Sequence, residues 1–330
     1  MNIQVIKQFN FVILLAGFII IPPLFFIIYR LIAYQAMPID AYWQYILYYL
    51  GNNPTYHPYA PFVYRPIYPL IGTLVYQILP LISFSEPTSF SPEQLKAIES
   101  LALINAISIY LIAVVSIWIL QESKQTNKSY ALTSGILVAS LMFYTAFFGI
   151  DPFAFLFTII LMKFDNTRSI FIPSILFSII ISEKICFVFF VYFLLKYFAT
   201  HKIDWISLIA TLLTMILYVF LRKWGPYGGH EEQINISSFK DSFANSLTYL
   251  RTIKGLYINV LPLLILLFFY FFSKKEIPGL WIFPVILFLI GLTMNMAFNI
   301  GRLVLHALPF FVPSIYQTVE RLSTRQISHG

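Results

Sequence analysis

Long apolar runs separated by short polar breaks repeat along the whole chain. A helix that crosses a bilayer needs about 20 mostly apolar residues, and seven runs come close to that length. Three shorter runs stand between the third and the fourth of them. The pattern predicts an all-α polytopic membrane protein with about ten transmembrane helices, at 11–29, 101–120, 130–150, 152–162, 170–182, 185–198, 205–221, 258–272, 279–299 and 303–317.

The runs 170–182 and 185–198 are separated by the charged pair Glu183 and Lys184. One long helix over both runs would place the pair in the middle of the membrane, where charged side chains are costly. A helical hairpin whose turn carries the pair avoids that cost. We therefore expect the hairpin.

Composition agrees with a membrane location. Hydrophobic residues make up 59% of the chain and charged residues 11%, whereas a soluble domain has about 25% charged residues. The net charge of +7 comes without a Lys/Arg cluster long enough to follow a phosphate backbone, which argues against nucleic acid as a partner. Cys186 is the only cysteine, so the chain has no intrachain disulfide and no Cys-cluster metal site.

The orientation depends on 67–84, an apolar segment bracketed by Pro66, Pro69 and Pro80. If this segment enters the outer leaflet or lies in the interface without crossing, and the N-terminus is cytoplasmic, every inner break contains lysine or arginine, as the positive-inside tendency requires. We therefore expect ten spans plus one re-entrant or interfacial segment, with both termini cytoplasmic. The basic residues on the inner face are then Lys7, Lys124, Lys128, Lys163, Arg168, Lys196, Lys202, Lys274, Lys275, Arg321 and Arg325.

No internal repeat or appended soluble domain is visible, so 1–330 is read as one membrane domain with two long extracytoplasmic loops, 30–100 and 222–257. The first loop contains ten of the chain's 22 tyrosines. Its residues 41–50 predict an aromatic amphipathic helix, which either anchors the loop in the interface or also walls a substrate groove. The groove candidates are Tyr42, Trp43, His57 and Tyr64.

Two aspartates are the candidate catalytic residues of the outer face. Asp40 precedes the aromatic helix, and Asp151 stands between two apolar runs and before Pro152. A carboxylate in such a place is suited to taking a proton from a hydroxyl. Each aspartate also suits the start of a helix, so capping is the alternative for both. If a divalent cation takes part, the same two aspartates are its candidate ligands.

Three cations are candidate ligands of a phosphate group. Arg65 lies in an extended stretch before Pro66, and its guanidinium is suited to two phosphate oxygens. Arg302 interrupts two apolar runs and has no carboxylate nearby in the sequence. Lys184 is the third candidate. The alternatives are lipid headgroups for the two arginines and a local pair with Glu183 for Lys184.

Several common catalytic signatures are missing. The chain has no Gly-rich phosphate loop, no His-Glu-x-x-His and no Gly-x-Ser-x-Gly, and its five histidines lack metal-ligand spacing. This argues against P-loop nucleotide hydrolases, zincin-type proteases and serine hydrolases of the nucleophile-elbow type.

The order of these features resembles the GT-C superfamily of membrane glycosyltransferases, which use polyprenyl-phosphate-linked sugars as donors. The matching features are an N-terminal span, the early acidic Asp40, the Tyr-Arg-Pro-Ile-Tyr-Pro element at 64–69, the later acidic Asp151, and the charged turn Glu183-Lys184, which together cover about the first 200 residues. The resemblance implies that Asp40 is the catalytic base, that Asp151 is a supporting or metal-binding acid, and that Arg65 or Arg302 binds the donor phosphate. It also implies an active site on the extracytoplasmic face and a glycan, lipid or protein acceptor. Asp40 is a single aspartate, not the acidic pair of several members, so metal dependence stays open.

Two other functions remain alternatives. A transporter or flippase would carry ionisable residues at the bilayer midplane and broken helices in two corresponding halves, and the sequence shows no such symmetry. In a non-catalytic assembly subunit, the aspartates would only cap helices. Replacing Asp40 by asparagine separates these possibilities, because asparagine caps a helix about as well as aspartate.

Overall fold

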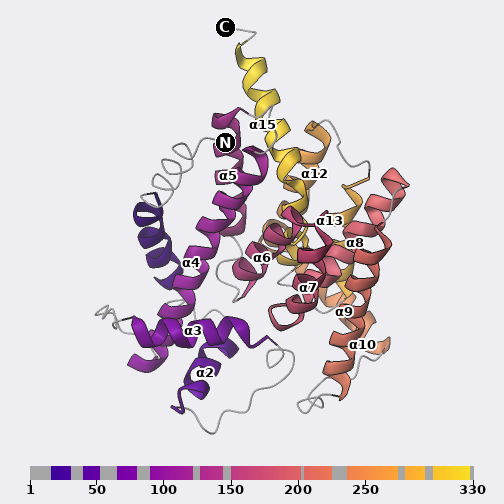
Figure 1. Ribbon diagram of the computed structural model, residues 1–330. Coiled ribbons are helices and arrows are strands. Elements are labelled where there is room, and N and C mark those ends of the chain that lie inside the picture. The colour runs from indigo at the N-terminus through magenta and orange to yellow at the C-terminus, as the bar shows by residue number, and fades with distance from the viewer. Residues whose placement is uncertain are drawn as a thin grey trace.

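The computed structural model describes residues 16–30, 40–52, 65–79, 90–121, 127–143, 150–201, 204–224, 236–273, 279–293 and 300–327 (Figure 1). Every regular element in these ranges is a helix. The expected all-α fold is therefore confirmed for this part of the chain.

The first described helix covers Ala16–Arg30. The elements that follow it in chain order are α2 (Asp40–Tyr49), α3 (Ile67–Ile78), α4 (Pro92–Gln121), α5 (Lys128–Phe143), α6 (Asp151–Lys163), α7 (Arg168–Phe177), η2 (Ser178–Ile180), α8 (Glu183–Thr200), α9 (Trp205–Trp224), α10 (Ile236–Leu250), α11 (Ile253–Gly255), the π-helical η3 (Leu256–Val260), α12 (Leu261–Phe272), α13 (Ile282–Thr293), α14 (Ile300–Leu305), η4 (Leu308–Phe311) and α15 (Val312–Ile327).

Two of the described helices are long and apolar enough to cross a membrane. They are Pro92–Gln121, with 30 residues, and Ile253–Phe272, with 20. Shorter apolar helices of 10–17 residues accompany them, α5 and α13 among them. The number of ten spans stays a prediction.

Local sequence explains where several helices begin. At the start of α4, Ser91 and Gln94 form a reciprocal capping box, in which each side chain accepts a hydrogen bond from the other residue's amide. α6 has Pro152 in its first turn, where the missing N–H costs nothing. α8 starts after Ser182, whose backbone is extended.

The charged pair Glu183-Lys184 lies at the turn of a helical hairpin, as expected. α7 and η2 lead into Ser182, and α8 leads away from it. Phe171 of α7 lies against Phe189 and Phe193 of α8, with ring centroids 5.3 and 5.5 Å apart. These contacts join residues on the two sides of the turn and hold the pair at one end of the bundle.

The two ends of the bundle differ in the charges that gather there. At one end, Lys163 covers the ring of Trp118 at 4.9 Å, Arg168 pairs with Asp204 at 3.1 Å, and Arg321 donates to the carbonyl of Phe272. We call this the basic end; α15 runs toward it, upward in Figure 1. α2 and α3 lie at the opposite end, which we call the site end.

The structure changes several features drawn from the sequence. α4 begins at Pro92, so the acidic segment that follows 67–84 becomes the first turns of a membrane-length helix and shortens the first loop. The second long loop contains α10. The run 303–317 is not one helix: it breaks at His306–Ala307 and passes through η4, where Pro309 has no N–H to continue a helix.

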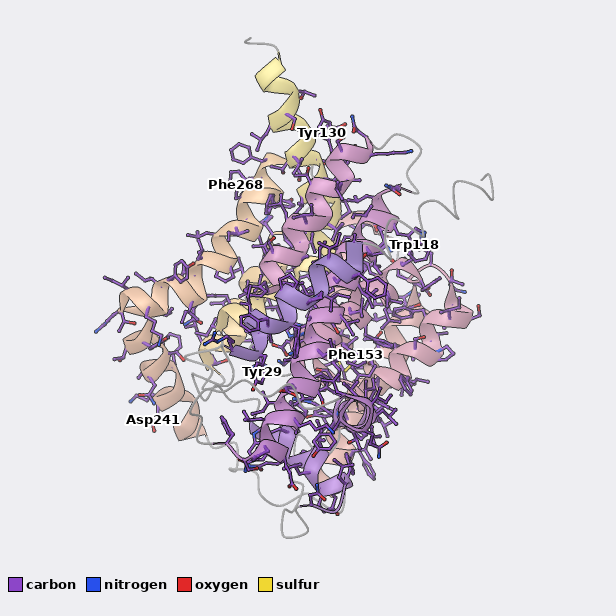
Figure 2. All side chains as sticks on the ribbon, turned by 90° about the vertical axis from the view of Figure 1, so that its left-hand side faces the viewer. Tyr29, Trp118, Tyr130, Phe153, Asp241 and Phe268 are labelled. Atoms are coloured by element: carbon purple, nitrogen blue, oxygen red, sulfur yellow. The ribbon has the colours of Figure 1, made fainter. Side chains whose placement is uncertain are left out.

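α3 lies across the lower part of α4 in Figure 1, and Figure 2, turned by 90°, shows it nearly end-on. With 12 residues it is about 18 Å long at 1.5 Å per residue, well short of a hydrocarbon core of about 30 Å. Its length and direction agree with an interfacial or re-entrant segment. Whether 67–84 crosses the bilayer stays a prediction.

Candidate functional site

Five ionisable side chains meet at the site end of the bundle. They come from four segments far apart in the sequence, because Arg65 precedes α3, Asp151 begins α6, Glu183 and Lys184 begin α8, and Arg302 lies in α14. We refer to these five residues as the charge cluster. Its members pair across the bundle, not along the chain.

Asp151 is the centre of the cluster. Its side chain is fully buried, and one carboxylate oxygen, Oδ1, accepts hydrogen bonds from Lys184 Nζ at 3.0 Å and from Arg302 Nη2 at 2.9 Å. The other oxygen accepts a second hydrogen bond from Arg302 Nε. The cations on Asp151 retain some exposure, 14% for the Lys184 side chain and 17% for that of Arg302. An anion that reaches this place would therefore meet the cations first.

Glu183 pairs with Arg65, not with its neighbour Lys184. Both carboxylate oxygens of Glu183 accept hydrogen bonds from the Arg65 guanidinium, one of them from Nε at 2.7 Å. The third guanidinium nitrogen, Nη1, donates to the hydroxyl of Tyr42 at 3.2 Å. The arginine thus joins α8 to the aromatic helix α2.

Burial and charge act against each other on the ionised groups. Burial alone would raise the pKa of Asp151, but the cations Arg302 and Lys184 outweigh it and hold that pKa well below its usual value. The pKa of Glu183 is likewise raised by burial and lowered more strongly by Arg65. Burial and the neighbouring charge of Arg302 lower the pKa of Lys184 to about 8. Both carboxylates are therefore ionised at neutral pH and poorly suited to taking up a proton.

The backbone that carries Arg302 is held by a π-helical turn. The amide of Gly301 donates to the buried side chain of Asn259 in η3 at 3.1 Å. A Cβ at Gly301 would overlap the carbonyl oxygen of Ile258, so only glycine allows this approach of α14 to η3. π-helical turns inside helices are often found at functional sites.

His306 completes the surroundings of Asp151. Its ring is buried and stacks on Phe155 at 5.5 Å. Its Nε2 lies 3.8 Å from Asp151 Oδ1, too far for a hydrogen bond, and has no other hydrogen-bond partner among the described residues. This histidine had no predicted role, although an isolated polar residue in the apolar run 303–317 was a signal for one.

Aromatic rings and one amide connect the cluster to α4. Tyr68 of α3 donates to Asn105 Oδ1 at 2.9 Å and packs edge-on against Tyr42, with ring centroids 5.2 Å apart. Phe153 of α6 packs against Tyr68 at 6.1 Å, and Figure 2 shows it low in the bundle next to α3. Tyr68 lies in the Tyr-Arg-Pro-Ile-Tyr-Pro element at 64–69 but was assigned no role of its own, and nothing near Asn105 in the chain marks that residue.

The sequence-based site residues have mixed outcomes in the structure. Arg65, Asp151, Lys184 and Arg302 meet in the charge cluster, as described above. Asp40 is the first residue of α2, two positions before Tyr42, but its side chain lies outside the described part of the structure, as do His57 and Tyr64.

The two remaining groove candidates have settled positions. Tyr42 is buried, and its hydroxyl accepts a hydrogen bond from Arg65. Trp43 is half-buried against Phe90, with ring centroids 6.3 Å apart. A groove wall formed by these residues stays a prediction.

A divalent cation fits the described part of this site poorly. No group of three or more His, Cys, Asp and Glu side chains among the described residues has the arrangement of a metal site. Asp151 is already surrounded by Lys184 and Arg302, whose charges repel a metal ion. A metal role for Asp151 therefore has no geometric support; for Asp40 it stays open.

Comparisons with known proteins leave the family open. No family model matches the chain, and neither a curated protein nor a solved structure is significantly similar to it.

Proposed function

We propose that this chain is a polytopic membrane glycosyltransferase that moves a sugar from a polyprenyl-phosphate donor to a hydroxyl acceptor on the extracytoplasmic face. The observation that carries the proposal is the charge cluster at one end of an apolar helical bundle. Stability alone does not explain it, because replacing buried ion pairs by apolar residues often leaves a protein as stable or more stable. Strongly perturbed ionisable groups gather most often at functional sites.

The proposed membrane orientation places the basic end in the cytoplasm and the site end outside. It is supported by the lysines and arginines of the basic end, which follow the positive-inside tendency. In this orientation the helices form ten spans, both termini are cytoplasmic, and α3 lies in the outer interface. The charge cluster then lies at the level of the outer headgroups, where a lipid-linked donor presents its phosphate.

The donor phosphate is assigned to the cations of the charge cluster. Among the five residues, three are cationic and two are anionic, so the cluster has one positive charge in excess. Lys184 and Arg302 both contact Asp151 Oδ1, so they can contact one phosphate group together. A phosphodiester carries one negative charge and balances the cluster.

The catalytic base is assigned to Asp40. Asp151 and Glu183 are bound to cations that lower their pKa values, so both are poorly suited to taking up a proton. α2 begins at Asp40, and Tyr42 ties that helix to Arg65. In the proposed step, Asp40 takes the proton of the acceptor hydroxyl while the oxygen of that hydroxyl bonds to the anomeric carbon of the sugar. The bond between the anomeric carbon and the phosphate oxygen breaks, and its electron pair leaves with polyprenyl phosphate.

The test uses the purified protein in lipid nanodiscs, undecaprenyl phosphate as the binding probe, and a panel of polyprenyl-phosphate-linked hexoses and pentoses as donors. We expect Asp40→Asn to bind undecaprenyl phosphate normally and to lose transfer by 100-fold or more, the scale of lost general base catalysis, about 10²–10⁴-fold. Arg302→Ala should lose binding, while Arg168→Ala at the basic end should change neither quantity.

Two results would overturn the proposal. Full sugar transfer by Asp40→Asn would show that Asp40 is not the catalytic base. Failure of the wild-type protein to bind undecaprenyl phosphate would show that the donor is not a polyprenyl-phosphate-linked sugar.

The position of the charges favours a transferase over a transporter. The cluster lies at helix ends, whereas a transporter of the broken-helix type binds its substrate near the bilayer midplane. If the chain is a non-catalytic assembly subunit, Asp40→Asn should leave its biological function unchanged.

A further inference from the structure

An apolar groove lies on the side of the bundle away from the charge cluster's helices α6 and α8. It has a volume of about 680 Å³, within the range of about 300–1,000 Å³ that is usual for small-molecule sites. Each of three helices contributes one row of side chains at helical spacing. The rows include Ile20 and Leu24 of helix Ala16–Arg30, Ala113 and Ile117 of α4, and Ile136 and Ala139 of α5.

The groove is closed at its base by the contact of α4 with α5, and the side chains along its two edges are exposed. A Cβ at Gly135 of α5 would overlap the side chain of Ile117, so α4 and α5 approach each other closely there. Along the edges, Ile20 is 43% exposed and Ile136 53% exposed. An exposed apolar groove of this kind is suited to an apolar ligand.

One end of the groove is polar and cationic. Gln121, the last residue of α4, and Lys128, the first of α5, line it there. Lys128 is exposed and forms no ion pair with any residue that the structure describes. This is the basic end of the bundle, so the groove's cation lies away from the charge cluster.

Tyr130, in the first turn of α5, marks the same end. Figure 2 faces the groove side and shows Tyr130 near the top of the bundle, Trp118 clearly lower and Tyr29 lower still. Tryptophan and tyrosine prefer the level of lipid headgroups. An apolar groove that ends in an exposed lysine at headgroup level matches the chemistry of an anionic phospholipid, with its chain in the groove and its phosphate at the lysine.

We propose that this groove binds one anionic phospholipid, with an acyl chain along α4 and α5 and its headgroup phosphate against Lys128. The lipid belongs to the leaflet of the basic end and is a resident of the protein, distinct from the donor at the site end. The inference rests on the proposed membrane location of the bundle and does not depend on the proposed transferase activity.

The experiment measures lipid retained by the purified full chain. Protein is reconstituted in nanodiscs with equal amounts of phosphatidylglycerol and phosphatidylcholine, extracted in mild detergent and examined by native mass spectrometry. We expect the wild type to retain phosphatidylglycerol at least tenfold over phosphatidylcholine. Lys128→Gln should lower that ratio at least fivefold, and Lys163→Gln, the same change at the same end outside the groove, should leave it unchanged.

A second variant and a labelling arm locate the lipid. Ala139→Phe fills the groove from α5 and should reduce retention of both lipids. Photoactivatable phosphatidylglycerol should label peptides of α4 and α5 in the wild type and label them at least fivefold less in Ala139→Phe. If Ala139→Phe fails to fold, the Lys128 comparison and the labelled wild-type peptides still decide the matter.

Several outcomes would overturn the proposal. Equal retention of the two lipids would show that Lys128 does not select an anionic headgroup. Equal effects of Lys128→Gln and Lys163→Gln would show that the preference comes from the general surface charge of the basic end. Labelling elsewhere, or a lipid-free dimer with the groove protected, would show a different occupant. Because none of these readouts requires sugar transfer, their failure is distinct from a failure of the transferase proposal.

Discussion

Removing the charge of Asp151 tests whether the ion pairs of the charge cluster form as the structure shows them. Asp151 is fully buried and accepts three hydrogen bonds, one from Lys184 and two from Arg302. Asp151→Asn leaves the shape nearly unchanged but leaves two mostly buried cations without their counter-charge. Breaking a buried ion pair by removing one partner costs about 3–5 kcal/mol, and we expect Asp151→Asn to lower the free energy of unfolding by that amount.

A second substitution separates charge from packing. Lys184→Met removes one of the two cations that Asp151→Asn leaves unpaired. The double variant should therefore be more stable than the sum of the two single effects, by about 1–3 kcal/mol, the range seen for residues in direct contact. At the basic end, Asp165→Asn breaks a pair in which Lys196 is 33% and Asp165 9% exposed. The Lys196 cation that remains can reach water, so this change should cost less than Asp151→Asn.

The assay is reversible unfolding in mixed micelles of a non-ionic detergent and dodecyl sulfate, followed by circular dichroism, with all variants at one pH and protein concentration. Two results would refute the reasoning. Asp151→Asn within about 0.5 kcal/mol of the wild type, the size of an ordinary surface substitution, would mean that the buried pairs do not form. Additive single effects would mean that Lys184 and Asp151 do not interact.

Three further predictions concern the same site. The pKa of Lys184 is about 8 in the free protein and should rise when an anion binds. The affinity for undecaprenyl phosphate should therefore fall by up to about tenfold per pH unit above pH 8. Isothermal titration between pH 7 and 9.5 measures that affinity, and an affinity that does not change with pH contradicts the prediction. In Arg65→Lys, the new lysine cannot bind both oxygens of Glu183, since an ammonium group lacks the planar pair of donors of a guanidinium. The affinity for the donor should drop at least tenfold in the same titration. Unchanged affinity would mean that Arg65 does not belong to the phosphate site. Gly301→Ala should destabilise the protein by about 1–3 kcal/mol, because the added methyl group meets the carbonyl oxygen of Ile258; the micelle unfolding assay checks it, and a neutral effect would mean that α14 does not approach η3 so closely.

The order of apolar runs was enough to predict helices, the hairpin turn at Glu183-Lys184, and the side of the bundle on which several charged residues lie. The reason is that sidedness only requires counting crossings: each predicted span carries the chain from one end of the bundle to the other, while the segment 67–84 was expected not to cross. Asp151, Lys184 and Arg302 could thus be assigned to one end without knowing which helices touch. Helix lengths were less predictable, since polar turns such as the start of α4 extend a helix beyond its apolar run.

Which charge pairs with which was decided only by the packing of the helices. From the sequence, Glu183 and Lys184 look like a local pair, yet they point to Arg65 and Asp151, residues 118 and 33 positions away. Successive residues on a helix do not face each other, so the start of α8 sends its two charges to different neighbours. The apolar pattern therefore determined that this chain forms a helical bundle with its charges at the helix ends. The tertiary structure decided that those charges form one partly buried cluster, because pairing depends on distances between segments that the sequence keeps far apart.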